Sequence, residues 1–241
     1  MLQKTRGIVL RTSEYSENSL IAKVYTEKQG LCSFLLNAAR GARAKFRPAL
    51  LQPLSPVEMV IYYKETRGMQ RVSEMKACLP LTSIPFDINK ISMALFLSEV
   101  LYKSVREEEE NRTLFNFIYN SICILDSAGE RYLNFHLAFL AQLTRYLGFY
   151  PADEYSELRT FFNIPEGRFQ REQPVHPHFL APPLSELWST LMKTSYENSG
   201  SLNLQTSERR RLLSALLSYY GFHVSGFGNV RSHEVLEQVM N

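Results

Sequence analysis

Four cationic side chains lie close together in the first quarter of the sequence, at Arg40, Arg43, Lys45 and Arg47. No acidic residue occurs between Glu27 and Glu58 to neutralise them. Arginine binds phosphate through planar, bidentate hydrogen bonds and also stacks on nucleobases. Because the four positions do not follow one face of a helix, the segment suits a flexible polyanion better than a rigid duplex groove. We predict that residues 40–47 bind an anion; a solvated basic loop without a ligand is the alternative.

The charge of the chain is divided unevenly along its length. Residues 1–80 contain 13 lysines and arginines against six glutamates, a formal net charge of +7, whereas residues 81–241 carry −4. This asymmetry indicates that the amino-terminal part binds an anion. The candidate phosphate-binding residues are Arg6, Arg11, Arg40, Arg43, Lys45, Arg47, Lys64, Arg67 and Arg71. The candidate base-stacking residues, each of which could instead pack in a core or at a barrel end, are Tyr15, Phe46, Tyr62 and Tyr63.

The sequence lacks the residue patterns typical of a catalytic or cofactor site. Gly226 and Gly228 are not followed by the third glycine of a dinucleotide-binding loop, and no glycine-rich loop ends in Lys-Ser or Lys-Thr. Ser73 and Lys76 have the spacing of a Ser-x-x-Lys pair but would face opposite sides of a strand. The basic part has no aspartate and only scattered glutamates, which disfavours a two-metal nuclease. We predict that the protein is not an enzyme and needs no cofactor.

Histidines and cysteines do not predict a metal site. The three cysteines are far apart, at Cys32, Cys78 and Cys123. Their number and spacing disfavour a disulfide framework or a zinc cluster and favour the reducing cytoplasm. His176 and His178 have no third ligand nearby in the sequence, so a surface loop is expected there. His136 lies among leucines and is expected at the edge of a core.

Hydrophobic periodicity predicts five short strands, at residues 6–11, 19–26, 31–36, 57–63 and 69–75. In the second strand Leu20, Ala22 and Val24 share one face, and Gly30 suits the turn that follows it. Five strands without a helix predict a small β-barrel or sandwich over residues 1–80.

A proline-containing linker at residues 80–85 separates this part from a helical one. Asp87 is expected to cap the first helix, and further helices are predicted around residues 114–125, 133–147, 184–196, 207–220 and 232–240. Residues 149–183 are predicted to be irregular, either with packing of their own or partly disordered. The expected fold class is α+β with two domains, 1–80 and 81–241, the second including an irregular insert at about 149–183.

Four consecutive glutamates occupy residues 107–110. We expect them in the first turn of the helix around Leu114, where they would complement the helix dipole. Binding of a partner or a metal is the alternative.

The order of a basic five-stranded module, a linker and a helical domain resembles the RecO family of bacterial recombination mediators. The similar residues in the amino-terminal part are 7–10, Tyr15, Glu17, Ile21, Thr26, Gly30, 39–43 and 51–54. Those in the helical part are 97–101, 114–115, 147–149, Pro151 and 232–236. The resemblance spans nearly the whole chain, and its specificity comes from the order and spacing of these pieces.

The resemblance implies an oligonucleotide/oligosaccharide-binding (OB) barrel followed by an α-helical domain. It implies binding of single- and double-stranded DNA without sequence specificity, annealing of complementary strands, and help in loading the RecA recombinase onto strands coated by the single-stranded DNA-binding protein. The implied partners are RecR, the acidic tail of the single-stranded DNA-binding protein and, in some lineages, RecF. The implied location is the cytoplasm, in association with the nucleoid.

One departure from the family pattern concerns zinc. Many members carry a four-cysteine zinc site after the segment corresponding to residues 147–149, whereas residues 150–183 contain no cysteine. We therefore predict no zinc here. Packing of four aromatic side chains is expected to hold this region instead, those of Phe161, Phe162, Phe169 and Phe179.

Other functions stay open on the sequence alone. The basic module could belong to an RNA-binding OB protein, or to an interaction adaptor that binds an acidic peptide. An enzyme acting on nucleic acid is a further alternative. No stretch approaches the roughly 18 uncharged apolar residues of a membrane span, so no membrane partner is expected.

Overall fold

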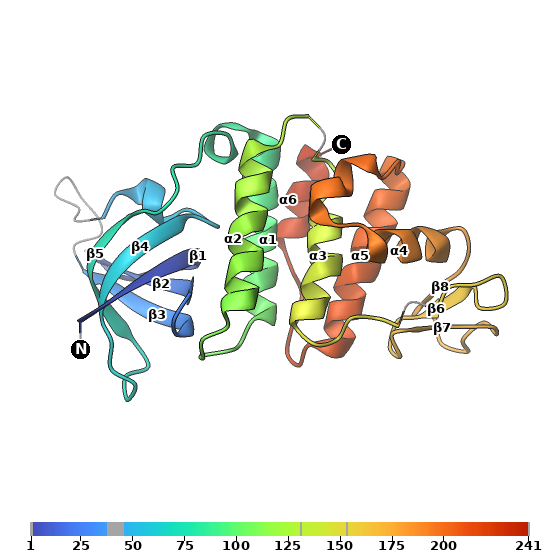
Figure 1. The fold of residues 1–241 in the computed structure, drawn as a ribbon, viewed down its shortest axis with the longest axis horizontal. Helices are drawn as coiled ribbons and strands as arrows, with labels where there is room; N and C mark the ends of the chain where they lie inside the picture. Colours follow the sequence, from blue (N-terminus) through green and yellow to red (C-terminus); the bar gives the residue numbers. More distant parts are fainter. Residues whose placement is uncertain (1, 38–45, 131, 153, 241) are drawn as a thin grey trace. The chain divides into compact units, whose positions relative to one another are not determined.

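The computed structural model describes residues 2–37, 46–130, 132–152 and 154–240 (Figure 1). The chain forms two compact units, Met1–Ser127 and Ala128–Asn241. The first unit extends beyond the barrel because two helices pack on it, and the domain boundary expected near residue 80 stays a prediction. Among the described residues, no helix combines the length and the apolar character that crossing a membrane requires.

Five strands form the barrel of the first unit: β1 (Leu2–Ser16), β2 (Ser19–Thr26), β3 (Gly30–Asn37), β4 (Pro56–Tyr62) and β5 (Gln70–Ala77). They close in the order β1-β2-β3-β5-β4, and all neighbouring pairs are antiparallel except β3 and β5. The parallel pairing, at Phe34 with Gln70 and Leu35 with Arg71, completes the barrel. The predicted five-stranded OB-type barrel followed by helices is confirmed.

Alternation of side chains along the strands fills the inside of the barrel. Val9, Val24, Phe34 and Met59 point inward and are fully buried. The short 3₁₀ helix η1 (Pro48–Leu51) and the residue Phe46 add side chains to this core. Phe46 is 2% exposed, so its ring presents no open face to a base, contrary to its predicted stacking role.

Two helices cover one side of the barrel, α1 (Ile88–Ser104) and α2 (Arg112–Ser127), and the 3₁₀ helix η2 (Ile84–Phe86) precedes them (Figure 1). Asp87 caps α1 as predicted, because its Oδ1 accepts hydrogen bonds from the backbone N–H groups of Asn89 and Lys90 at 2.9 and 3.3 Å. Tyr25, on the outer face of β2, is buried and stacks on Phe115 of α2 with ring centroids 6.3 Å apart.

The glutamates at 107–110 precede α2 and do not lie in its first turn, so the predicted capping role is wrong. Asn111 caps the helix instead, since its Oδ1 accepts a hydrogen bond from the Leu114 N–H at 3.0 Å. The glutamate segment contacts the start of β3 through its backbone, where the Leu31 N–H donates to the Glu107 carbonyl at 2.8 Å.

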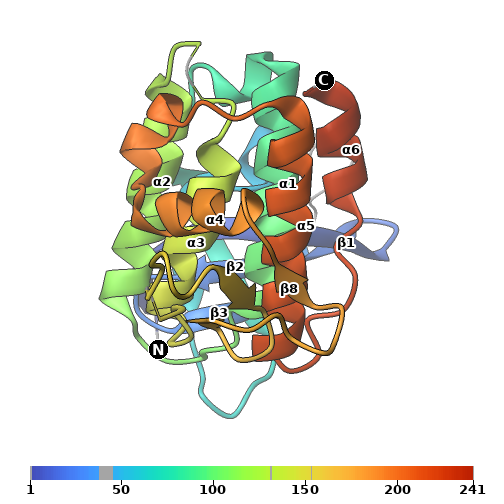
Figure 2. The ribbon, with the colours of Figure 1, turned by 90° about the vertical axis from the view of Figure 1, so that its right-hand side faces the viewer.

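The second unit consists of helices and one small sheet. The helices are α3 (Phe135–Tyr146), α4 (Leu184–Lys193), α5 (Thr206–His223) and α6 (Ser232–Val239), with the 3₁₀ helix η3 (Tyr196–Ser201). The first three of these α-helices pack on one another (Figure 2). As predicted, α3 ends before Gly148, whose φ of +82° favours glycine.

The segment 149–183, expected to be irregular, contains a three-stranded sheet in the order β7-β6-β8. Its strands are β6 (Phe161–Asn163), β7 (Arg168–Gln170) and β8 (Phe179–Leu180). The predicted aromatic packing is present, because the ring of Phe162 lies 5.0 Å from that of Phe169 and 4.7 Å from that of Trp188. Phe161 and Phe179 meet edge to face at 6.0 Å.

Candidate nucleic-acid interface

The β4–β5 hairpin brings four of the predicted site residues together. Tyr62 and Arg71 are the cross-strand pair next to its loop, and Lys64 and Arg67 are exposed in the loop between the strands. Tyr62 and Arg71 point away from the barrel, because their neighbours along the chain, Ile61 and Val72, point into its core. Tyr62 is 52% exposed. Three cations and one aromatic ring are therefore available to a ligand on one hairpin.

Gln70, which no sequence pattern singled out, holds this loop in shape. Its side chain is 4% exposed, and its Oε1 accepts a hydrogen bond from the Lys64 N–H at 2.9 Å. Its Nε2 donates to the carbonyls of Lys64 and Arg67 at 2.9 and 2.7 Å. Both ends of the loop are thereby tied to one buried amide, which positions the side chains of Lys64 and Arg67.

Arg6 is engaged inside the first unit. Its Nη2 and Nε donate to the two carboxylate oxygens of Glu27 at 2.7 and 3.0 Å. Its guanidinium also lies 5.2 Å from the ring centroids of both Phe115 and Tyr119 on α2. The hydrogen bond with Arg6 lowers the pKa of Glu27, and the same bond raises the pKa of Arg6. These partners leave Arg6 little capacity for phosphate.

The other predicted cations are spread over the barrel. Arg11 is exposed on β1, with its guanidinium 5.3 Å from the ring centroid of Tyr102 in α1. Arg47 is exposed immediately before η1. Three of the candidates, Arg40, Arg43 and Lys45, lie outside the described residues.

Two further cations, not predicted as site residues, flank a glutamate on the barrel surface. Lys4 and Lys76 each contact the Glu58 carboxylate, with Nζ to Oε1 distances of 3.1 and 3.3 Å. Glu58 and Lys76 belong to the strands of the same hairpin, at the end away from its loop, and the pairing partly neutralises the surface there.

The remaining aromatic residues predicted to stack on bases differ in how far their rings are exposed to solvent. Tyr15 is 61% exposed near the β1–β2 turn, where Glu14 and Glu17 flank it in the sequence. Tyr63 is half-buried against the barrel core, and burial raises its pKa. Tyr62 therefore combines an open ring with neighbouring positive charge, and Tyr15 does not.

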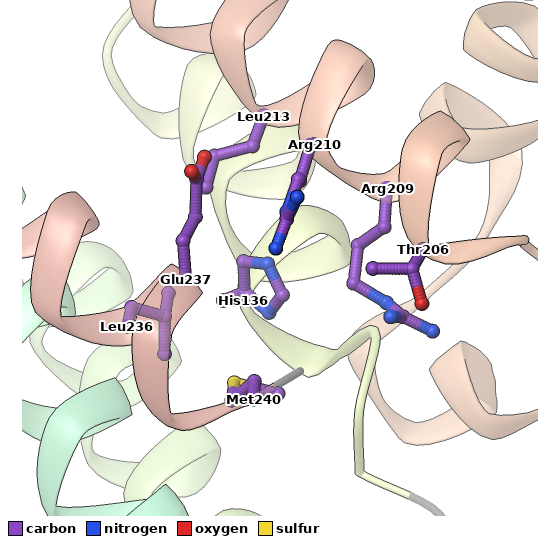
Figure 3. Close-up of a pocket in the computed structure, with 8 residues that line it drawn as sticks. All are labelled: His136, Thr206, Arg209, Arg210, Leu213, Leu236, Glu237 and Met240. Atoms are coloured by element: carbon purple, nitrogen blue, oxygen red, sulfur yellow. The ribbon is translucent and has the colours of Figure 1, made fainter.

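A small cavity of about 20 Å³ in the second unit is lined in part by His136, Arg209 and Arg210 (Figure 3). Burial lowers the pKa of His136 to about 3, so this imidazole is neutral at physiological pH. Arg209 donates through Nε to Asn134 Oδ1 at 2.9 Å. The volume admits little more than a water molecule, which makes the cavity part of the helix packing.

No group of three or more metal-ligating side chains occurs in the part of the chain that the structure describes. His176 and His178 lie next to each other, with ring centroids 6.1 Å apart, and the His178 N–H donates to His176 Nδ1. This bond occupies one of the ring nitrogens through which the pair would bind a metal.

These features define a class of protein: an OB-type barrel with exposed cations on one hairpin, followed by helices. Comparison with known proteins narrows the class. The family model "Recombination protein O N terminal" matches residues 1–80, and "Recombination protein O C terminal" matches residues 85–232.

Curated relatives agree with the family models. The DNA repair protein RecO of Phocaeicola vulgatus is 36% identical over 241 residues, which cover 100% of both chains. The proteins of the same name from Bacteroides fragilis and Flavobacterium psychrophilum are 36% and 35% identical, over 100% and 99% of both chains. The chain belongs to the RecO family of DNA repair proteins.

Proposed function

We propose that this chain is a non-enzymatic mediator of DNA repair and recombination. It binds single- and double-stranded DNA without sequence specificity, anneals complementary strands and helps to load the RecA recombinase onto strands coated by the single-stranded DNA-binding protein. The observation that carries this proposal is the exposed cluster of Lys64, Arg67 and Arg71 beside Tyr62, on the barrel of a RecO family member.

Charge neutralisation explains how such a surface promotes annealing. Two complementary strands repel each other through their phosphates, and lysine and arginine side chains relieve this repulsion as counterions are released. Contacts to phosphate carry no base information, which accounts for binding to any sequence. Arg11 and Arg47 add exposed positive charge elsewhere on the barrel, and the sequence places Arg40, Arg43 and Lys45 shortly before η1.

The proposed partners are those that the resemblance to the family implies. They are RecR, the single-stranded DNA-binding protein and, in some lineages, RecF. The proposed location is the cytoplasm, in association with the nucleoid.

Salt-dependent DNA binding tests the proposal. If about five cations contact phosphate, the logarithm of the binding constant for a single strand should fall with the logarithm of salt concentration at a slope near −3.5. The triple variant Lys64→Ala, Arg67→Ala, Arg71→Ala should lose about two units of this slope, measured by fluorescence anisotropy. A slope near zero for the unmodified protein would contradict the electrostatic mechanism.

A matched control removes the same charge from the second unit, with Arg168→Ala, Arg171→Ala and Lys193→Ala, and should leave the slope unchanged. An annealing assay on complementary strands, with and without the coating protein, tests the mediator role. Tighter binding of RNA than of DNA, binding of an acidic peptide but not of DNA, or strand cleavage with Mg²⁺ would each overturn the proposal.

A further inference from the structure

One level of the barrel surface carries apolar side chains where outward positions are ordinarily polar. Strand register places Leu2 beside Tyr62, Tyr62 beside Arg71, Arg71 beside Leu35, and Leu35 beside Ile21. Side chains at paired positions point to the same face of a sheet. The five side chains therefore form one row around the outer surface of the barrel. Each of the five strands contributes one residue to it.

The ends of this row differ in how open they are. Leu2 is 55% exposed beside the exposed Tyr62, whereas Leu35 and Ile21 are half-buried. The open end, at β1 and β4, thus offers a flat aromatic ring next to an aliphatic side chain. This pair of side chains is suited to contact with a flat apolar group.

The charged residues around Tyr62 indicate which kind of ligand fits this surface. The guanidinium-bearing Arg71 lies in the row itself, and Lys64 and Arg67 lie in the loop above it. Two acids are near, Glu65 in the same loop and Glu74 at the next outward position of β5, and the three cations exceed them. A ligand with flat rings and regularly spaced negative charges fits this combination.

We infer that Tyr62 is a stacking platform for unpaired nucleobases, with Arg71 and the β4–β5 loop holding the adjacent phosphates. This inference deepens the proposed function and rests on it. Bases inside a duplex are already stacked on each other and cannot present a face to Tyr62. The platform therefore distinguishes single strands from duplexes, whereas the cations attract both.

Tyr15 is the natural comparison, because it is exposed to a similar degree on the same barrel. Glu14 and Glu17 flank it, and these carboxylates would repel the phosphates of a bound strand. The inference accordingly assigns stacking to Tyr62 and not to Tyr15.

The experiment measures the affinity of full-length variants for a single-stranded oligonucleotide and for a duplex of equal length. Tyr62→Ala should weaken single-strand binding at least about fivefold, in line with the contribution of one stacked base, and leave duplex binding unchanged. Tyr62→Phe should retain the affinity of the unmodified protein, because it keeps the ring. Tyr15→Ala should behave as the unmodified protein, and an abasic oligonucleotide should abolish the effect of Tyr62→Ala.

The outcomes separate the platform from the proposed function. Equal loss of single-strand and duplex binding in Tyr62→Ala, or no loss in either, overturns the platform while the DNA-binding function stands. Loss in Tyr62→Phe equal to that in Tyr62→Ala also overturns it. Failure of the unmodified protein to bind either DNA overturns the proposed function and the platform together.

Discussion

Arg6 illustrates how the partners of a single residue decide its role. It forms two hydrogen bonds with Glu27, and its guanidinium lies over the rings of Phe115 and Tyr119. We predict that Arg6→Met lowers the free energy of unfolding by about 1–3 kcal/mol, because the charge-assisted bonds and the ring contacts are lost and Glu27 is left without this partner. Affinity for DNA should stay within about twofold, as phosphate contacts are not removed. Urea unfolding and anisotropy measure the two quantities.

Arg11→Met on the same strand is the control for Arg6. Arg11 is exposed and contacts one ring, that of Tyr102, so its replacement should cost less than about 1 kcal/mol. If Arg6→Met reduced DNA affinity as strongly as removal of Arg71 while leaving stability unchanged, Arg6 would be a DNA ligand after all.

The candidate site could be predicted from the sequence only in part, for reasons visible in individual residues. Arg6 and Arg71 both lie in predicted strands of a basic region, and nothing in their neighbourhoods distinguishes them. Glu27 pairs with Arg6 only once β1 and β2 are aligned, and Arg71 meets Tyr62 only once β4 and β5 are. Gln70 was missed because its function depends on loop carbonyls that the sequence does not place.

Among the elements, one carboxylate holds the linker between the barrel and α1. Asp126, near the end of α2, accepts hydrogen bonds from the N–H groups of Thr82, Ser83 and Ile84 at 2.8 to 2.9 Å, and from Thr82 Oγ1 at 3.0 Å. Burial alone would raise the pKa of Asp126, but these four donors outweigh it and the pKa is lowered. The linker preceding α1 is thereby fixed to α2.

We predict that Asp126→Asn lowers the free energy of unfolding by about 1–3 kcal/mol at pH 7, because the amide turns a donor toward backbone donors. A carboxyl group with a lowered pKa in the folded state contributes stability that is complete above its unfolded pKa, near 3.8, and is lost as pH falls through the folded pKa. The difference in the free energy of unfolding between the unmodified protein and Asp126→Asn should therefore be constant from pH 7 to 5 and should become smaller below pH 4. Urea unfolding at each pH measures it; a difference that persists unchanged into acid would refute the assignment.

Helices and strands could be predicted from the sequence wherever they were long enough to show a hydrophobic period. The strand at 19–26 and the Asp87 cap were predicted with the bounds that the structure has. The small sheet was missed because β6, β7 and β8 have two or three residues each, too few to show alternation. The glutamates at 107–110 misled because Asn111, one residue later, supplies the capping oxygen.

At the scale of the molecule, composition and packing divide the chain at different places. The net charge and the period of the hydrophobic pattern change near residue 80, whereas the compact unit ends at Ser127. The difference arises because Ile8, Leu10 and Tyr25, on the outer face of the barrel, are almost completely buried in the first unit. A run of consecutive apolar residues such as Ile8, Val9 and Leu10 indicates that a strand is apolar on both faces. It does not show which element covers the outer face.

This packing predicts how fragments of the chain behave. A fragment of residues 1–80 loses α1 and α2 and exposes Ile8, Leu10 and Tyr25, at about 1.5–3 kcal/mol for each side chain. The sum is comparable with the whole stability of a domain, about 5–15 kcal/mol, so the fragment should unfold without a cooperative transition. A fragment of residues 1–127 keeps these contacts and should unfold cooperatively and bind DNA within a few-fold of the full chain. Circular dichroism on heating and anisotropy test both, and a 1–80 fragment as stable as 1–127 would show that the helices are dispensable to the barrel.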